Sequence, residues 1–459
     1  MSVKKRSLII IICIFIQSIF FFSCQVNNSQ PTEPPETVIE PTEQQQCLIR
    51  ELNDMLFPLG PSPLELSDNE LSFLDQLSDA RFVGLGEATH GTREFFQMKH
   101  RIFKYLVENL NHKVFGFESD FAECIYINNY VTKGEGDLED LMRTKMQHLI
   151  WKTEEVKELL EWMKNYNMGK SDEDKIHFVG FDCQSTNLHI DLIREYVEPL
   201  LPGLWETAAP ILDQVNSLTN WHYKRLLQEE YDFLIARLES FESQLAANKD
   251  QLVANSSLDE YRIACQLFKT FRQSFMKSYL YYSCIDKPNW RERFMAENVQ
   301  WIADFFGPDT KMTLWAHNRH VAKDISYDVG GSMGYNLHNA VGDLYQVVGF
   351  GFSRGKFTAD VSIGMVSLGE HEITAVPIQS SVNFIFHHAA HSNFAFHLDA
   401  ISAGSEWGNW LTAPVPFLII GNNFSGCPED YYIDIDLRIH YNWIIYIDTT
   451  TASRLIPLY

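Results

Sequence analysis

Four short apolar runs along this chain are each followed directly by a residue that can take part in acid/base chemistry. Apolar runs of this length, separated by stretches with helical spacing, are typical of buried strands in a mostly parallel sheet. In such a sheet ligands bind beyond the carboxyl ends of the strands, where all four runs place their polar residue. The pattern therefore predicts a site at that edge. The runs are 82–86, 114–117, 176–181 and 312–316, and they are followed by Glu87, Glu118, Asp182 and His317.

Between these runs the apolar residues change to helical spacing. This spacing predicts helices over 93–110, 153–166 and 291–306. Strands that alternate with helices favour an α/β fold with a mostly parallel central sheet flanked by helices. From about 199 to 288 helical periodicity continues without a strand run, which we interpret as a helical insertion, or lid, over the sheet. Later strands are expected in 344–352, 357–361, 384–386 and 443–447.

The first 46 residues differ in composition from the rest. Basic residues at 4–6 precede an almost unbroken apolar stretch over 8–22, which ends in Ser23 and Cys24. This pattern resembles a bacterial lipoprotein signal over residues 1–24, with Cys24 as the lipidated residue. An uncleaved membrane anchor is the less favoured alternative, because a span usually needs about 18 apolar residues. Residues 25–46 are rich in Pro, Glu and Gln, which predicts a disordered tether before a globular domain over 47–459.

Charge and cysteine content argue against two classes of function, nucleic-acid binding and zinc binding by cysteines. The chain has 37 Lys and Arg against 60 Asp and Glu, a net charge of −23. An acidic chain without a basic stripe would repel nucleic acid, so a small organic substrate fits better. The cysteines after residue 24 are scattered without zinc-type spacing, and we expect free thiols. The signal-like segment, the tether and the globular domain together predict an exported protein held at a bacterial envelope membrane by a lipid anchor.

Glu87 and His90 lie in a glycine-rich segment, VGLGEATHGTREFF, between a predicted strand and a predicted helix. A carboxylate beside an imidazole can fix the ring's tautomer and raise its basicity, which would make His90 a general base for water. The zinc-protease helix motif is excluded, because Gly86 stands where that motif needs a histidine. The alternative interpretation is that Glu87 caps the following helix and His90 is a polar loop residue.

Glu118 ends a run as apolar as any in the chain. An unpaired buried carboxylate is costly, so Glu118 either takes part in chemistry or forms a structural salt bridge. The candidate partners are Arg93, Arg101 and Arg143.

His317 and His320 are three residues apart and can face one ligand if the segment turns helically. Asn318 or Arg319 could add donors for an oxyanion. Structural histidines are the alternative. Asp182, in VGFDCQ, is expected either to bind the substrate or to support a neighbouring loop.

Gly330 to Gly334 matches Gly-x-Ser-x-Gly, the nucleophile-elbow pattern of serine hydrolases. An elbow requires a strand immediately before it, whereas residues 323–329 are polar and turn-like. A nucleophilic Ser332 is therefore disfavoured.

Five segments taken together resemble the erythromycin esterase family. They are GLGEATHGTREFF, FGFES, RERFMAENVQW, WAHNRHV and MGYNLHNAVGDLYQVVGFGFSRGKF, in family order, and the resemblance covers roughly 70–360. It implies an α/β core with helical additions and hydrolysis of a macrolide lactone by histidine-activated water. It also implies that His90 is the essential histidine and that Glu87, Glu118, His317 and His320 line the cleft. The lipoprotein-like N-terminus departs from the macrolide-inactivating members, so the resemblance supports ester hydrolysis better than erythromycin as the substrate.

The main hypothesis is therefore an esterase without cofactor or metal. In it, His90, oriented by Glu87 or Glu118, activates water, and His317 or His320 binds the oxyanion or protonates the leaving group. The substrate contacts are expected from Arg93, Asp182, Trp315 and Asn318. One alternative is a metal-dependent hydrolase whose ligands would be Glu87, His90, Glu118, His317 and His320. The other is a surface lipoprotein that binds a ligand in the same cleft without catalysis.

Overall fold

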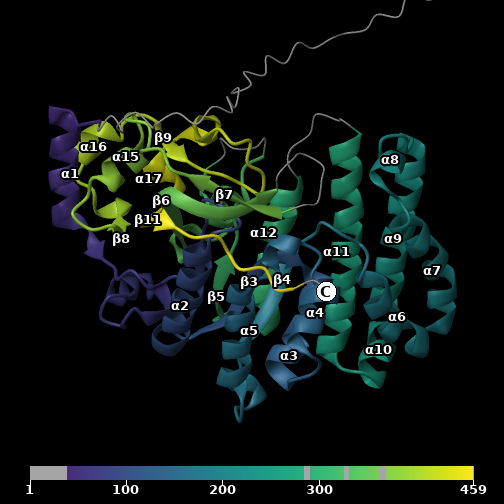
Figure 1. Ribbon diagram of the computed structural model, residues 1–459. Helices are drawn as coiled ribbons and strands as arrows, with labels where there is room; N and C mark the ends of the chain where they lie inside the picture. The colour runs from purple at the N-terminus through teal and green to yellow at the C-terminus, as the bar shows by residue number, and fades with distance from the viewer. Residues whose placement is uncertain (1–38, 284–289, 325–329, 361–367, 458–459) are drawn as a thin grey trace, which may run out of the picture. The chain divides into compact units, whose positions relative to one another are not determined.

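The computed structural model describes residues 39–283, 290–324, 330–360 and 368–457 (Figure 1). The signal segment, Cys24 and most of the predicted tether lie outside these residues. Residues 41–459 form one compact unit. Its first helix, α1 (Glu43–Met55), begins after Thr42, whose side chain caps the helix in a capping box with Gln45. The predicted end of the tether at residue 46 therefore falls inside this helix.

A mixed, mostly parallel sheet forms the centre of this unit, as predicted. All neighbouring strands from β11 to β4 are parallel, whereas β1, β8 and β7 join the sheet antiparallel. In spatial order the sheet contains β1 (Phe57–Pro58), β8 (Asn393–His397), β11 (Trp443–Thr450), β6 (Tyr345–Asp360), β2 (Phe82–Leu85), β5 (Lys311–Trp315), β3 (His112–Asp120) and β4 (His177–Asp182), with β7 (Leu368–Ile373) beside β6. The four predicted strands are thus direct neighbours, β2-β5-β3-β4.

Both faces of the sheet are buried, which explains why the strands are continuously apolar. Along β2, Phe82 packs into one core and Val83 into the other. The first core holds residues of α12 (Trp290–Phe306), α14 (Met333–Val341), α1, α15 (Val382–His387) and α16 (Glu406–Trp410). The second core holds residues of α2 (Arg93–Leu110), α4 (Leu138–Thr144) and α5 (Glu154–Asn167), and α3 (Phe121–Lys133) contributes to both. Helices therefore cover the two faces, as expected for an α/β fold.

β4 is the last strand in the spatial order of the sheet. The segment that follows it in the chain is helical, as predicted. It contains α6 (His189–Leu200), α7 (Pro202–Asn216), α8 (Asn220–Tyr223), α9 (Gln228–Ala247), α10 (Lys249–Asn255) and α11 (Leu258–Tyr282). These helices gather beyond β4 (Figure 1). A buried amide network joins them to the sheet: Asn298 of α12 donates to the Phe181 carbonyl and to Gln273, and accepts from Gln266. The role of a lid stays a prediction.

The remaining elements lie after β5. They are α13 (Asn318–Val321), α17 (Leu437–His440) and the antiparallel pair β9 (Val415–Leu418) and β10 (Tyr432–Ile435). Residues 384–386, predicted as a strand, instead lie in α15, because Ser381 caps a helical turn by accepting from the Phe384 N–H. Cys124 and Cys183 are buried free thiols. No helix within the described residues is both long and apolar enough to cross a membrane.

Candidate active site

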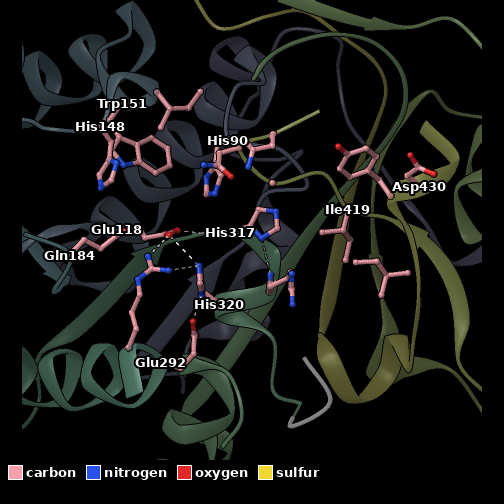
Figure 2. Close-up of a pocket in the computed structure, with 18 residues that line it drawn as sticks. His90, Glu118, His148, Trp151, Gln184, Glu292, His317, His320, Ile419 and Asp430 are labelled. Atoms are coloured by element: carbon pink, nitrogen blue, oxygen red, sulfur yellow. Dashed lines mark hydrogen bonds and ion pairs between the residues drawn. The ribbon is translucent and has the colours of Figure 1, made fainter. Parts of the chain in front are cut away.

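A cavity of about 510 Å³ opens beyond the carboxyl ends of the four neighbouring strands (Figure 2). The strand register brings the residues that follow these strands together. Leu85 of β2 and Phe117 of β3 both pair with Trp315 of β5, so the residues after these three positions lie at the same edge of the sheet. Four residues predicted from the sequence line the cavity: His90, Glu118, His317 and His320. Arg319, considered from the sequence as an oxyanion donor, and Gln184, which ends the run of Asp182, line it as well. The residues that the strand pattern did not predict are His148, Trp151, Arg291, Glu292 and a wall from the segment 419–433.

His90 is held by a buried carboxylate. Its Nδ1 lies 2.7 Å from Glu87 Oε1, and Glu87 is fully buried behind the cavity. The other oxygen, Oε2, accepts from Lys99 Nζ at 2.6 Å. Because Glu87 engages Nδ1, the Nε2 of His90 is the ring nitrogen left for the cavity. This is the arrangement of an imidazole with a fixed tautomer that can accept a proton from water.

Lys99 extends this pair into the core. Its ammonium lies 4.4 Å from the centre of the Trp315 ring, and the side chain is fully buried. Burial lowers the pKa of Lys99 to about 8, although Glu87 acts in the opposite direction. Glu87 therefore cannot shift toward another partner without taking its carboxylate away from the buried Lys99 ammonium.

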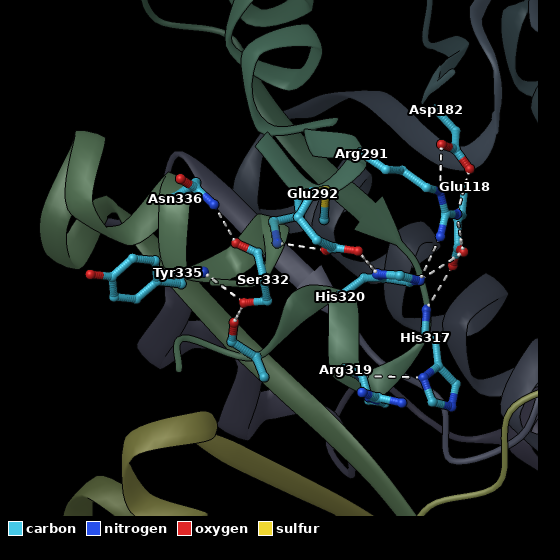
Figure 3. A network of polar contacts seen from close by, with 12 residues as sticks. Glu118, Asp182, Arg291, Glu292, His317, Arg319, His320, Ser332, Tyr335 and Asn336 are labelled. Carbon is cyan, nitrogen blue, oxygen red and sulfur yellow. Dashed lines mark hydrogen bonds and ion pairs between the residues drawn. The ribbon is translucent and has the colours of Figure 1, made fainter. Parts of the chain in front are cut away.

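Glu118 binds three groups of the opposite wall (Figure 3). Its Oε1 accepts from Arg291 at 2.9 Å and lies 3.2 Å from His320 Nε2, while Oε2 accepts from the His317 N–H at 2.9 Å. Burial opposes the charge, but His320, His90 and Arg291 hold the pKa of Glu118 well below its usual range. Glu118 is therefore a weak base whose position fixes its neighbours.

The partner of Glu118 is Arg291 of α12, and none of the three arginines considered from the sequence. Arg93 lies 3.6 Å from Glu155, Arg101 pairs with Asp68, and Arg143 pairs with Glu139. Arg93 and Arg101 sit on α2 and Arg143 on α4. The carboxylates that they contact lie on α5, in a loop and on α4 itself, and none of them lies at a strand end.

Arg291 also binds Asp182, with Nε and Nη2 donating at 2.9 and 2.6 Å. Burial opposes the charge of Asp182, but Arg291 keeps the pKa of this carboxyl below its usual value. Asp182 is fully buried and does not line the cavity, so it supports Arg291 from behind.

His320 is held in the cationic form by two carboxylates. Nδ1 lies 2.7 Å from Glu292 Oε1, and Nε2 lies near Glu118. Burial disfavours the charge, but Glu292 and Glu118 outweigh it and raise the pKa of His320 to about 10. Glu292 is itself anchored, because its Oε2 accepts from the Met333 N–H at the start of α14. His320 and Arg291 thus place two fixed positive charges beside the cavity.

His317 is neutral. Its Nε2 lies 3.1 Å from the Ile420 carbonyl, and its Nδ1 accepts from the Arg319 N–H. Burial and the neighbouring His90 and His320 hold the pKa of His317 well below its usual value. Its ring centre lies 4.9 Å from that of His90, so it forms the floor against which His90 packs.

The other three residues expected to contact the substrate do not reach the cavity either. Arg93 faces Glu155. Trp315 is fully buried and packs against Phe96 and Phe117. Asn318 is buried and forms paired hydrogen bonds with the backbone of Phe350. Asn318 therefore joins the loop to β6 rather than supplying an oxyanion donor.

Ser332 is a helix cap. It is buried, and its Oγ accepts from the Tyr335 N–H at the start of α14 and donates to the Ala322 carbonyl (Figure 3). It does not line the cavity. The Gly-x-Ser-x-Gly match is thus explained by helix capping and by the close approach of Gly334 to the backbone of Val321, where a Cβ would lie 2.0 Å from the carbonyl oxygen.

Across the described residues, no three His, Cys, Asp or Glu side chains are arranged to hold a metal ion. Two of the five residues named for the metal alternative, Glu87 and Glu118, are carboxylates. Their oxygens contact Lys99, Arg291, the histidines and a backbone N–H group. This geometry gives the metal-dependent alternative no support.

Comparison with known proteins identifies the family. The family model described as erythromycin esterase matches residues 107–450. Among curated proteins, "Putative hydrolase YbfO" of Bacillus subtilis is 29% identical over 273 residues, which are 56% of this chain and 60% of that protein. Erythromycin esterase type II of Escherichia coli is 28% identical over 298 residues, 60% of this chain and 69% of that protein. The matched part of this chain thus spans less than two thirds of the length of YbfO.

A solved structure extends the agreement. The crystal structure of a Bacillus cereus protein superposes with a TM-score of 0.79 at 25% identity and covers 91% of this chain and 100% of that chain. The family model spans most of the folded unit, including β3, β4, β5 and the loop of His317. The chain therefore belongs to the erythromycin esterase family.

Proposed function

We propose that this protein hydrolyses a carboxylic ester or a lactone with water activated by His90, without a covalent enzyme intermediate. The observation that carries the proposal is the 2.7 Å contact between Glu87 Oε1 and His90 Nδ1, at the wall of the cavity. A buried carboxylate that fixes the tautomer of a cavity-lining imidazole is a typical general-base arrangement.

The reaction follows from the charges around the cavity. His90 Nε2 takes a proton from water as the water oxygen attacks the carbonyl carbon of the ester. The resulting oxyanion develops near the cations His320 and Arg291, which stabilise it because they are already in place. When the carbon–oxygen bond to the alcohol breaks, the proton on His90 passes to the leaving alkoxide, and an acid and an alcohol result.

The role of proton donor to the leaving group, expected from the sequence for His317 or His320, does not fit their contacts. Both ring nitrogens of His317 and of His320 already have partners, so neither is a convenient proton donor. We propose that His320 acts through its charge, and that Glu118 and Glu292 position it. The names of the Escherichia coli relatives make macrolide lactones the first substrates to test. The lipoprotein signal and attachment to a bacterial envelope membrane remain part of the proposal on sequence grounds alone.

The experiment measures hydrolysis of an activated aryl ester and of several macrolides by residues 41–459. His90→Gln is compared with His391→Gln, which alters an exposed histidine outside the cavity. We expect His90→Gln to lower kcat/KM by at least about 10²-fold and His391→Gln to leave it unchanged. Unaltered turnover by a folded His90→Gln protein would refute the mechanism.

Two controls separate the alternatives. Turnover that is lost on chelation and restored by added metal would favour the metal-dependent hydrolase. Saturable binding of an ester or macrolide without any product would favour the non-catalytic binding protein.

A further inference from the structure

Gln184 lines the cavity from the loop that follows β4, and two carboxylates behind the wall fix its position (Figure 2). Its backbone N–H donates to Asp120 Oδ1, and its side-chain Nε2 donates to Asp182 Oδ2 at 2.7 Å. Asp120 and Asp182 are both buried, whereas Gln184 itself is only half-buried. The backbone and the side chain of Gln184 are therefore both held in place at the cavity.

The charge of Asp182 decides which way the Gln184 amide points. Although burial opposes that charge, Arg291 keeps the pKa of Asp182 below its usual value, so Asp182 is ionised and can only accept hydrogen bonds. The amide nitrogen of Gln184 must therefore face Asp182, and the carbonyl oxygen Oε1 is left for a ligand. Within the described part of the chain no group donates to Oε1. Gln184 thus presents a fixed acceptor that needs a donor from water or from the substrate.

The Gln184 amide lies beside Arg291, one of the two cations proposed to stabilise the oxyanion. Gln184 Nε2 and Arg291 Nη2 donate to the same oxygen, Asp182 Oδ2, at 2.7 and 2.6 Å. Because the two groups share one acceptor atom, they are close neighbours. A substrate donor that reaches Gln184 Oε1 therefore lies only a few bonds from the carbonyl group that reacts.

His148 supplies a second polar group on the same side of the cavity as Gln184 (Figure 2). The loops that carry the two residues are joined, because Gln147 Nε2 donates to Ser185 Oγ at 2.6 Å. Burial lowers the pKa of His148, so its ring is neutral and offers one donor and one acceptor. Among the residues that the structure describes, neither ring nitrogen of His148 has a hydrogen-bond partner. His148 can therefore bind a ligand together with Gln184.

We propose that Gln184 and His148 form a hydroxyl-binding subsite, and that the substrate is an ester with a free hydroxyl group close to its carbonyl. The hydroxyl donates to Gln184 Oε1 and accepts from the ring N–H of His148. An ammonium group has three donors, of which this single fixed acceptor would match only one. A methyl ether cannot donate, so it would leave Oε1 unpaired once water is displaced. The substrate class rests on the proposed ester hydrolysis, whereas the subsite can also be tested by binding alone.

The test compares matched esters, with acid release followed in a pH-stat. Residues 41–459 are suitable, because the buried core of the described residues runs from Leu48 to Ile456. Methyl lactate and methyl O-methyllactate place the hydroxyl on the acyl side, and ethylene glycol monobutyrate and its methyl ether place it on the alcohol side. We expect kcat/KM to be at least about tenfold higher for the hydroxy ester of one pair, and that pair identifies the side. Methyl alaninate, with an ammonium group in place of the hydroxyl, should react no faster than methyl O-methyllactate.

Variants assign the preference to the subsite. Gln184→Leu removes the acceptor and should reduce the preference for the hydroxy ester to within about twofold. His148→Leu should lower the preference as well, and it tests the same subsite if Gln184→Leu does not fold. The matched control is Gln300→Leu, which alters another half-buried glutamine whose Nε2 donates to an oxygen, but outside the cavity. It should keep the full preference. Thermal melting shows that each variant is folded.

Equal rates for the hydroxy ester and the methyl ether of both pairs, or a preference that survives in Gln184→Leu, would overturn the subsite while ester hydrolysis stands. Faster turnover of methyl alaninate than of methyl lactate would overturn it in favour of an amino ester. If no ester is hydrolysed, the proposed function fails, and calorimetric binding of the same pairs decides the subsite alone. Tighter binding of the hydroxy ester to wild type, lost in Gln184→Leu, would support the subsite. Equal binding, or no binding of either member, would overturn it.

Discussion

Glu87 has two partners, and this allows its role in catalysis to be separated from its role in stability. Glu87→Gln removes the charge that holds His90 and pairs with Lys99. We expect kcat/KM to fall by about 10²-fold and the free energy of unfolding to fall by about 3 kcal/mol, because a buried ammonium is left unpaired. Adding Lys99→Met removes that ammonium. The double variant should regain stability in urea unfolding while its rate stays low. A recovery of rate together with stability would show that Glu87 acts only through packing.

At the residue scale, the sequence predicted His90, Glu118, His317 and His320 because each follows or lies close behind a strand end. It missed Arg291 and Glu292, which lie on α12, far along the chain from Glu118. No local pattern relates a helix residue to a carboxylate so distant in sequence. The one signal was the segment RERFMAENVQW, which contributed to the family resemblance. Arg93, expected as a partner of Glu118 or as a substrate contact, instead lies in the first turn of α2 and faces Glu155.

At the scale of elements, α14 tests the interpretation of Ser332. Ser332→Ala removes a cap that accepts from the Tyr335 N–H, so we expect the free energy of unfolding to fall by about 1 kcal/mol. Ester hydrolysis should stay within about twofold of wild type, because Ser332 lies outside the cavity. Chemical denaturation and steady-state kinetics measure the two effects. Loss of activity without loss of stability would instead support a serine nucleophile.

Element predictions succeeded where the periodic pattern was long. The helix expected over 93–110 agrees with α2, which ends where Asn111 adopts a left-handed conformation. The strand expected over 384–386 is helical, because three apolar or aromatic residues do not distinguish a period of 2 from one of 3.6. The capping Ser381 just before them decided the outcome.

For the whole molecule, the sequence predicted the fold class and the edge of the sheet that carries the site. It did not predict the strand order, in which β5 lies between β2 and β3 although it comes some two hundred residues later. Pairing of distant strands depends on packing across the completed core. Hydrophobic periodicity reports only that a strand is buried, and not which strand lies beside it.

Several histidines buried in the fold make the stability of the whole molecule depend on pH. Burial lowers the pKa of His112 and of His189 to about 3 each. Their unfolded forms take up protons near pH 6.5, so the stability they contribute is present above that pH and is lost as the pH falls toward 3. Each should cost about 3 kcal/mol at pH 4. His320, with its pKa raised to about 10, has the opposite sign: its contribution is complete below pH 6.5 and is lost as the pH rises through 10.

We therefore expect the stability of residues 41–459 to be greatest near neutral pH, because the lowered and the raised histidine pKa values act on opposite sides of it. Urea unfolding between pH 4 and pH 10 measures the profile. His112→Asn should flatten the acid side, since the side chain no longer takes up a proton on unfolding, whereas the exposed His391→Gln should not. An acid side that is equally steep in His112→Asn and in wild type would mean that His112 is not held neutral by burial. Stability that stays constant from pH 7 to pH 4 would contradict the same assignment for His189, because both rings depend on exclusion of water.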